Sequence, residues 1–137
     1  MFALVKVLTI TFFVTGLTFS RKMPDHVFKI WMELAGPYSN DCAAKTNPDP
    51  KDVDAFVNRG FVPLHKPVTC FVNCLYQQMQ VLKPNGEVHM EKMMELGSYM
   101  TPEVSQMCTD EAEWYSGNDM CEKAYILGNC IIHALAV

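Results

Sequence analysis

The chain has 137 residues, 50% of them hydrophobic, and carries 11 basic and 15 acidic residues for a net charge of −4. This length allows one domain with a modest core, and the acidic balance disfavours nucleic acid as a partner. Six cysteines and ten methionines are the unusual parts of the composition.

Residues 1–20 predict a secretory signal peptide. Lys6 precedes thirteen uncharged, mostly apolar residues, and Thr18 and Ser20 occupy the −3 and −1 positions of a cleavage site. We therefore expect a mature domain over residues 21–137, with a charge of about −5, secreted into extracellular fluid. No later segment reaches the roughly 20 apolar residues of a membrane span.

The first predicted helix begins near Pro24. Five apolar residues recur on one of its faces: Val27, Phe28, Trp31, Met32 and Ala35. Gly36-Pro37 is expected to break or kink this helix, with a further turn or two ending near Cys42.

Two more helices are expected before residue 84. Asp49-Pro50 is typical of a helix start, and that helix ends near Asn58 with Gly60 as its cap. Pro67 opens a third helix, which contains CFVNC and continues to the Pro-Asn-Gly turn at 84–86.

The last three predicted helices cover the C-terminal third. The fourth, roughly 88–97, carries three methionines on one face: Met90, Met93 and Met94. The fifth starts at Thr101-Pro102 with Val104, Met107 and Cys108 facing inward. Asp119, with Glu122 three residues later, predicts a capping box for a buried helix over about 120–135.

The cysteines predict three disulfides, because an even count in a small secreted chain favours bonding. Cys70 and Cys74 share a helix face, and a bond between them would strain the helix. Cys121 and Cys130 lie on roughly opposite sides of the last helix. Excluding these two pairs leaves ten of fifteen pairings open. Zinc is a weaker interpretation, because the remaining cysteines are scattered.

The full spacing is C-x27-C-x3-C-x33-C-x12-C-x8-C. It resembles the six-cysteine form of the insect odorant-binding proteins, of the pheromone and general odorant type, and the x3 and x8 gaps are the specific part. CEKAY at 121–125 and DAF at 54–56 are also similar to that family. The resemblance implies an all-α fold of about six short helices around an internal apolar cavity. It also implies three disulfides: Cys42–Cys74, Cys70–Cys121 and Cys108–Cys130.

The implied function is a non-enzymatic, secreted carrier of small hydrophobic ligands, without cofactor or metal. An olfactory receptor and a second copy of the chain are further candidate partners. Flexible methionines suit a wall that must adapt to varied apolar shapes, although ordinary core packing competes for each residue. The candidate ligand contacts are Phe28, Trp31, Phe56, Phe71, Leu75, Met79, Met90, Met93, Met94, Met107, Tyr125, Leu127 and Ile131. Candidate polar groups are Tyr76, Tyr125 and His133.

Two other classes of protein compete with this carrier. A saposin-like, membrane-interacting protein is also small, secreted and rich in disulfides, but the x3 cysteine pair lies mid-chain here. A secreted hydrolase lacks a Gly-x-Ser-x-Gly or His-Glu-x-x-His motif. Within the resembled family, a carrier that serves outside olfaction is a further alternative.

Overall fold

The described fold consists of helices. The computed structural model describes residues 22–97 and 99–136, so the expected signal peptide lies outside the described residues. Within these residues there are six helices: α1 (Asp25–Thr46), α2 (Pro50–Asn58), α3 (Lys66–Gln78), α4 (Met90–Glu95), α5 (Pro102–Glu113) and α6 (Met120–Leu135). Within the described residues, the β-type pairing consists of one isolated antiparallel bridge between Leu82 and Val88. The prediction of an all-α fold is confirmed.

Three helix starts are fixed by local capping. The side chain of Asp49 accepts a hydrogen bond from the Lys51 N–H, and that of Thr101 accepts one from the Val104 N–H. A proline follows each of these caps, where its missing N–H costs nothing. Asp119 caps α6 by accepting from two backbone N–H groups. These starts lie where the sequence predicts them.

Two helix ends differ from the prediction. A single helix, α1, continues through Pro37 to Thr46, so a break at 36–37 is wrong, and a kink there stays a prediction. The third helix ends at Gln78, well before the turn at 84–86. Gln80 has a φ of 63°, and the N–H groups of Val81 and Leu82 both return to the carbonyl of Tyr76. The chain therefore turns back early and packs Val81 and Leu82 into the core.

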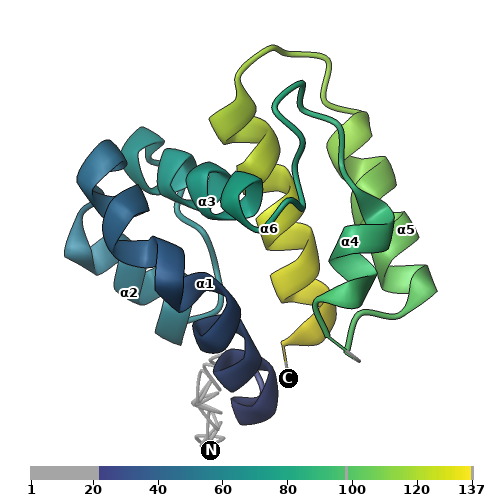
Figure 1. Cartoon of the computed structure of the whole chain (residues 1–137), viewed down its shortest axis with the longest axis horizontal. Coiled ribbons are helices and arrows are strands. Elements are labelled where there is room, and N and C mark those ends of the chain that lie inside the picture. The colour runs from purple at the N-terminus through teal and green to yellow at the C-terminus, as the bar shows by residue number, and fades with distance from the viewer. Residues whose placement is uncertain (1–21, 98, 137) are drawn as a thin grey trace, which may run out of the picture.

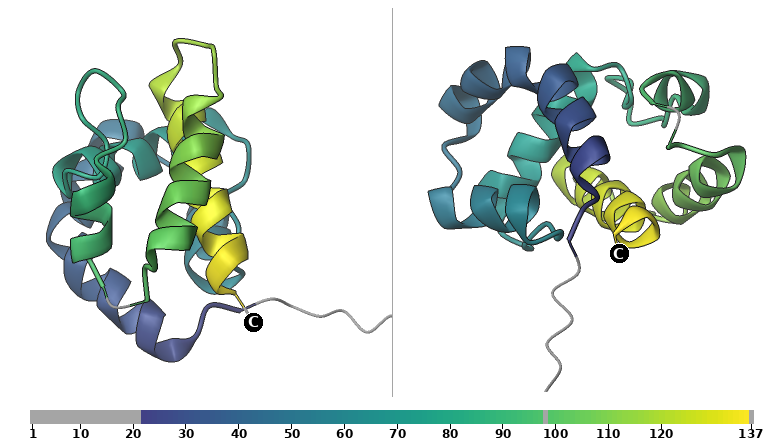
Figure 2. Two further views of the ribbon diagram at one scale, coloured as in Figure 1. Left: turned by 90° about the vertical axis from the view of Figure 1, so that its right-hand side faces the viewer. Right: turned by 90° about the horizontal axis from the view of Figure 1, so that it is seen from below.

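Helix α6 lies in the middle of the molecule (Figure 1). Helices α1, α2 and α3 lie on one side of it and α4 and α5 on the other, an arrangement that the view from below repeats (Figure 2). Its central position agrees with its apolar sequence, since Leu127 and Ile132 on two different sides are fully buried.

Three disulfides join the helices. Cys42–Cys74 links α1 to α3, Cys70–Cys121 links α3 to α6, and Cys108–Cys130 links α5 to α6. These are the pairs that the resemblance implies. Because α3 and α6 each carry two bonded cysteines, they form a cross-linked centre to which α1 and α5 are attached.

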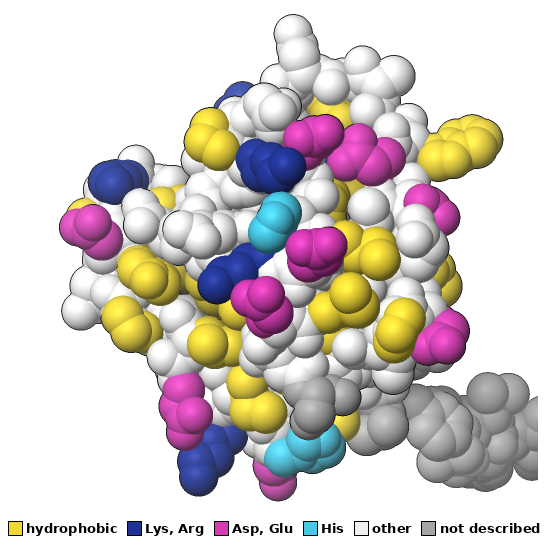
Figure 3. Space-filling model, turned by 45° about the vertical axis from the view of Figure 1, so that its right-hand side comes forward, with side chains coloured by type: hydrophobic (Ala, Val, Ile, Leu, Met, Phe, Trp, Pro, Cys, Tyr) yellow, Lys and Arg dark blue, Asp and Glu magenta, His cyan; other side chains and the backbone are white. Residues whose placement is uncertain are grey.

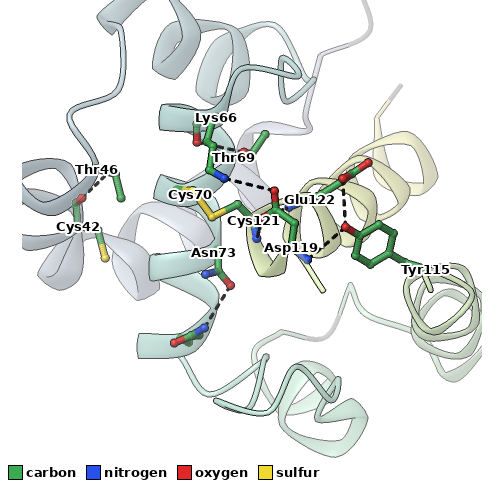
Figure 4. The surroundings of a disulfide bond; sticks show 11 residues. Cys42, Thr46, Lys66, Thr69, Cys70, Asn73, Tyr115, Asp119, Cys121 and Glu122 are labelled. Carbon is green, nitrogen blue, oxygen red and sulfur yellow. Dashed lines mark hydrogen bonds and ion pairs between the residues drawn. A yellow bond between two sulfur atoms is a disulfide. The ribbon is translucent and has the colours of Figure 1, made fainter. Parts of the chain in front are cut away.

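Hydrogen bonds surround the central disulfide (Figure 4). Asp119 Oδ1 accepts from the N–H groups of Cys121 and Glu122, at 3.0 and 3.4 Å. The expected capping box is completed differently, because the Tyr115 hydroxyl accepts from the Asp119 N–H and donates to Glu122. Lys66 Nζ lies 3.5 Å from Asp119 Oδ2, so an ion pair also joins α3 to the start of α6.

Charged side chains lie at the surface. On the face drawn in Figure 3, acidic and basic side chains alternate with apolar ones that also reach the surface. Among the described residues, no helix is both long and apolar enough to cross a membrane. The same residues contain no cluster of three His, Cys, Asp or Glu that could hold a metal ion.

Candidate functional site: an apolar cavity

A cavity of about 240 Å³ lies between α1, α2, α3, α4, one residue of α6 and the segments that follow α3 and α4. None of the side chains that line it is charged. The lining residues are Phe28, Trp31, Met32, Leu34, Ala35, Ser39, Val53, Phe56, Val57, Phe71, Leu75, Tyr76, Met79, Val81, Met93, Leu96, Tyr99, Met100 and Ile131.

The largest part of the wall comes from α1. Phe28, Trp31, Ala35 and Ser39 follow one another at helical spacing, so they form one stripe along the cavity. The stripe reaches Ser39 only because the helix continues through Pro37. Met32 lines the cavity and is also 48% exposed, so it lies between the cavity and solvent.

Helices α2 and α3 supply the opposite wall. Val53, Phe56 and Val57 recur at i, i+3 and i+4 on α2, and the ring of Phe56 stacks on Trp31 with centroids 6.3 Å apart. Phe71 and Leu75 from α3 lie beside the two cysteines of CFVNC. Because Cys74 is bonded to Cys42, the disulfide holds α1 and α3 together at one end of the cavity.

Many of the sequence-predicted contacts come together at this cavity. Those that line it are Phe28, Trp31, Phe56, Phe71, Leu75, Met79, Met93 and Ile131, together with the candidate polar residue Tyr76. Their contact with a ligand stays a prediction.

Five predicted contacts lie outside the cavity. Leu127 is fully buried in the solid core, one helical turn before Ile131, which does line the cavity. Met90 and Met94 flank Met93, but α4 has only six residues and turns Met93 alone into the cavity. Met107 is 51% exposed, so its expected inward orientation is wrong. Met107, Tyr125 and the polar candidate His133 line a separate groove instead.

This groove is open to solvent and lies over α5 and α6. Its residues are Phe61, Val62, Met107, Glu111, Tyr125, Ile126, Asn129, Cys130, His133 and Ala134. The Asn129 side chain accepts from the Val62 N–H and donates to the Val62 carbonyl, which fixes the 60–65 segment on α6.

The sequence prediction missed ten lining residues. Four of them had a usable signal, because Met32, Ala35, Val53 and Val57 continue the helical periodicity of predicted contacts. Leu34 and Ser39 lie at the edge and the end of the α1 stripe. The other four, Val81, Leu96, Tyr99 and Met100, stand in connecting segments, where no periodicity indicates which side faces inward.

The structure defines the position of four polar groups of the wall, which belong to Trp31, Ser39, Tyr76 and Tyr99. The Trp31 Nε1–H donates to the Tyr99 hydroxyl at 2.6 Å, and the Ser39 hydroxyl donates to the Ala35 carbonyl at 3.0 Å. The Tyr76 hydroxyl lies against Gly128 of α6, 3.2 Å from where a Cβ would stand. Burial raises the pKa of both Tyr76 and Tyr99, so both hydroxyls stay protonated at neutral pH.

A comparison with protein families shows to which family the chain belongs. The model of the PBP/GOBP family matches residues 29–134, which include every lining residue except Phe28. The chain belongs to the PBP/GOBP family, the insect odorant- and pheromone-binding proteins. Proteins of the PBP/GOBP family are binding proteins rather than enzymes, and the helical fold with three disulfides is consistent with that family.

Proposed function

We propose that this PBP/GOBP protein is a secreted carrier that holds one small hydrophobic ligand, such as an odorant or pheromone, in the apolar cavity. The uncharged wall, made almost entirely of apolar side chains, is the observation that carries the proposal. Such a wall favours apolar molecules because it offers them burial without the cost of displacing ions or water from charged groups. Transport through extracellular fluid follows from the predicted signal peptide.

The cavity volume limits the ligand. At about 240 Å³ the cavity is smaller than the ~300–1,000 Å³ pockets that take drug-sized molecules, which favours a small ligand. At about 0.8 kcal/mol per atom, within the range for small ligands, a molecule of about ten non-hydrogen atoms binds with about micromolar affinity. An olfactory receptor and a second copy of the chain as partners stay predictions.

Filling the cavity tests the proposal. Ala35 lines the cavity, whereas Ala44 is exposed on the same helix, so Ala35→Phe and Ala44→Phe form a matched pair. The probe is N-phenyl-1-naphthylamine, whose fluorescence rises in apolar surroundings. We expect Ala44→Phe to bind it like the unmodified protein and Ala35→Phe to lose binding at least tenfold.

Trp31 gives a second readout. The chain has two tryptophans, and Trp114 is 88% exposed, so Trp114→Phe leaves the cavity tryptophan as the only one. Ligand binding should then change the Trp31 emission in step with probe displacement. A folded Ala35→Phe variant that binds the probe unchanged would show that the cavity is not the binding site.

A further inference from the structure

Within the described residues, two tyrosine hydroxyls of the cavity wall, those of Tyr76 and Tyr99, have no acceptor for their protons, and Tyr99 is the one whose oxygen is anchored by a hydrogen bond. Trp31 Nε1–H can only donate, so in the 2.6 Å contact the Tyr99 oxygen is the acceptor and its own proton must point elsewhere. Within residues 22–97 and 99–136, no side chain or carbonyl is paired with that proton. The Trp31 N–H and the Ser39 hydroxyl are both already engaged.

The position of Tyr99 is fixed from two sides. Trp31, 68 residues away on α1, holds its oxygen at the cavity wall. Its ring lies directly on Gly97, where an added Cβ would overlap the ring. The glycine thus makes room for the aromatic ring, and the hydroxyl is held in place before any ligand arrives.

The other tyrosine hydroxyl is placed differently. Tyr76 is buried, and its oxygen lies beside Gly128 of α6. Tyr99 therefore differs from Tyr76 in being anchored by a donor across the cavity. Burial raises the pKa of Tyr99 above its ordinary value of 10.0, although the bond from Trp31 opposes this, so the hydroxyl remains a donor at neutral pH.

We propose that Tyr99 is a specificity-determining residue, whose hydroxyl donates to an oxygen acceptor on the ligand and selects carbonyl-bearing chains over pure hydrocarbons. This inference rests on the proposed function. A half-buried donor such as the Tyr99 hydroxyl loses its hydrogen bond to water when a hydrocarbon covers it, whereas an aldehyde, ketone or ester oxygen satisfies it. The Trp31 bond strengthens the selection, because an accepted hydrogen bond polarises the hydroxyl toward donation.

The test compares two ligands of equal size in two tyrosine variants. Nonanal and decane have the same number of non-hydrogen atoms, and each is used to displace N-phenyl-1-naphthylamine from the full mature protein. Tyr99→Phe should weaken nonanal binding about three- to tenfold and leave decane binding unchanged or improved. Tyr76→Phe, which removes the other wall hydroxyl, should leave the ratio of the two affinities unchanged.

The outcomes separate this inference from the proposed function. If neither ligand nor the probe binds the unmodified protein, the proposed function fails. If both bind but Tyr99→Phe leaves their ratio unchanged, or Tyr76→Phe changes it equally, only the selection by Tyr99 is wrong. Circular dichroism and a thermal transition establish that both variants are folded.

A measurement on the unmodified protein does not depend on any variant. Nonanal labelled with ¹³C at the carbonyl, bound to the protein, should show its C=O stretch at a lower frequency than in a hydrocarbon solvent, because a donated hydrogen bond weakens the double bond. A band at the hydrocarbon position would overturn the proposal.

Discussion

Leu75 and Leu127 have the same side chain and nearly the same burial, with 3% and 0% exposure, but different surroundings. Leu127 lies among packed side chains, whereas Leu75 borders the cavity. Side chains beside a void already lack contact partners on that side, so truncating them forfeits fewer dispersion contacts. The two leucines therefore distinguish solid core from cavity wall.

We expect Leu127→Ala to lower the free energy of unfolding by about 4 kcal/mol and Leu75→Ala by about 2–3 kcal/mol. Urea unfolding with the disulfides intact measures both values. Leu75→Ala should in addition enlarge the cavity and admit a ligand one or two carbons longer, which Leu127→Ala should not. Equal losses of stability in the two variants would place both leucines in the same kind of environment.

Residue periodicity predicts that a side chain faces inward but not what it faces. Helix α6 is apolar nearly all round, so the sequence does not separate Ile131, at the cavity, from Leu127, in the core. On α5, Cys108 is turned inward by its disulfide to α6, and the neighbouring Met107 is thereby rotated about 100° onto the open groove. Whether a side chain faces the cavity, the solid core or the open groove therefore depends on tertiary packing.

At the scale of an element, Asp119 controls the start of α6. Its Oδ1 satisfies two N–H groups that have no partner inside the helix, while its Oδ2 pairs with an exposed lysine, Lys66. An N-cap aspartate is worth about 0.5–2 kcal/mol, whereas an exposed ion pair contributes ~0–1 kcal/mol. The cap should therefore outweigh the ion pair.

We expect Asp119→Ala to lower the free energy of unfolding by about 1–2 kcal/mol and Lys66→Ala by less than about 0.5 kcal/mol. Asp119→Asn keeps a capping oxygen without the charge, so it should stay close to the unmodified protein. Thermal unfolding followed by circular dichroism measures all three. A loss for Lys66→Ala as large as that for Asp119→Ala would show that the ion pair, and not the cap, holds the helix start.

Element starts were predictable because their causes are local. Asp49-Pro50, Thr101-Pro102 and Asp119 place a capping side chain before the helix, and α2, α5 and α6 begin there. Element ends were harder because distant contacts decide them. The packing of α1 along the cavity and the Cys42–Cys74 bond offset the cost of Pro37, and α3 ends where Val81 and Leu82 turn back into the core.

For the molecule as a whole, the cavity and the disulfides are linked. A hollow interior costs stability in proportion to its volume, and each native disulfide in a small domain contributes ~2–5 kcal/mol. The three bonds differ in what they attach. Cys42–Cys74 attaches α1, which supplies six of the lining residues, whereas Cys108–Cys130 attaches α5, which supplies none.

Removing one disulfide at a time separates its effect on the free energy of unfolding from its effect on ligand binding. Cys42 and Cys108 are both fully buried, so Cys42→Ala/Cys74→Ala and Cys108→Ala/Cys130→Ala lose comparable packing, and each should cost ~2–5 kcal/mol in chemical unfolding. Loss of the Cys42–Cys74 bond leaves α1 free to move. The entropy that is lost when α1 becomes ordered around the probe should weaken probe affinity about tenfold or more. Loss of the Cys108–Cys130 bond should leave probe affinity within about twofold, because the cavity wall stays attached. If both double variants bound the probe equally well, α1 would be held at the cavity by its packing alone, and the disulfide in CFVNC would serve stability without shaping the site.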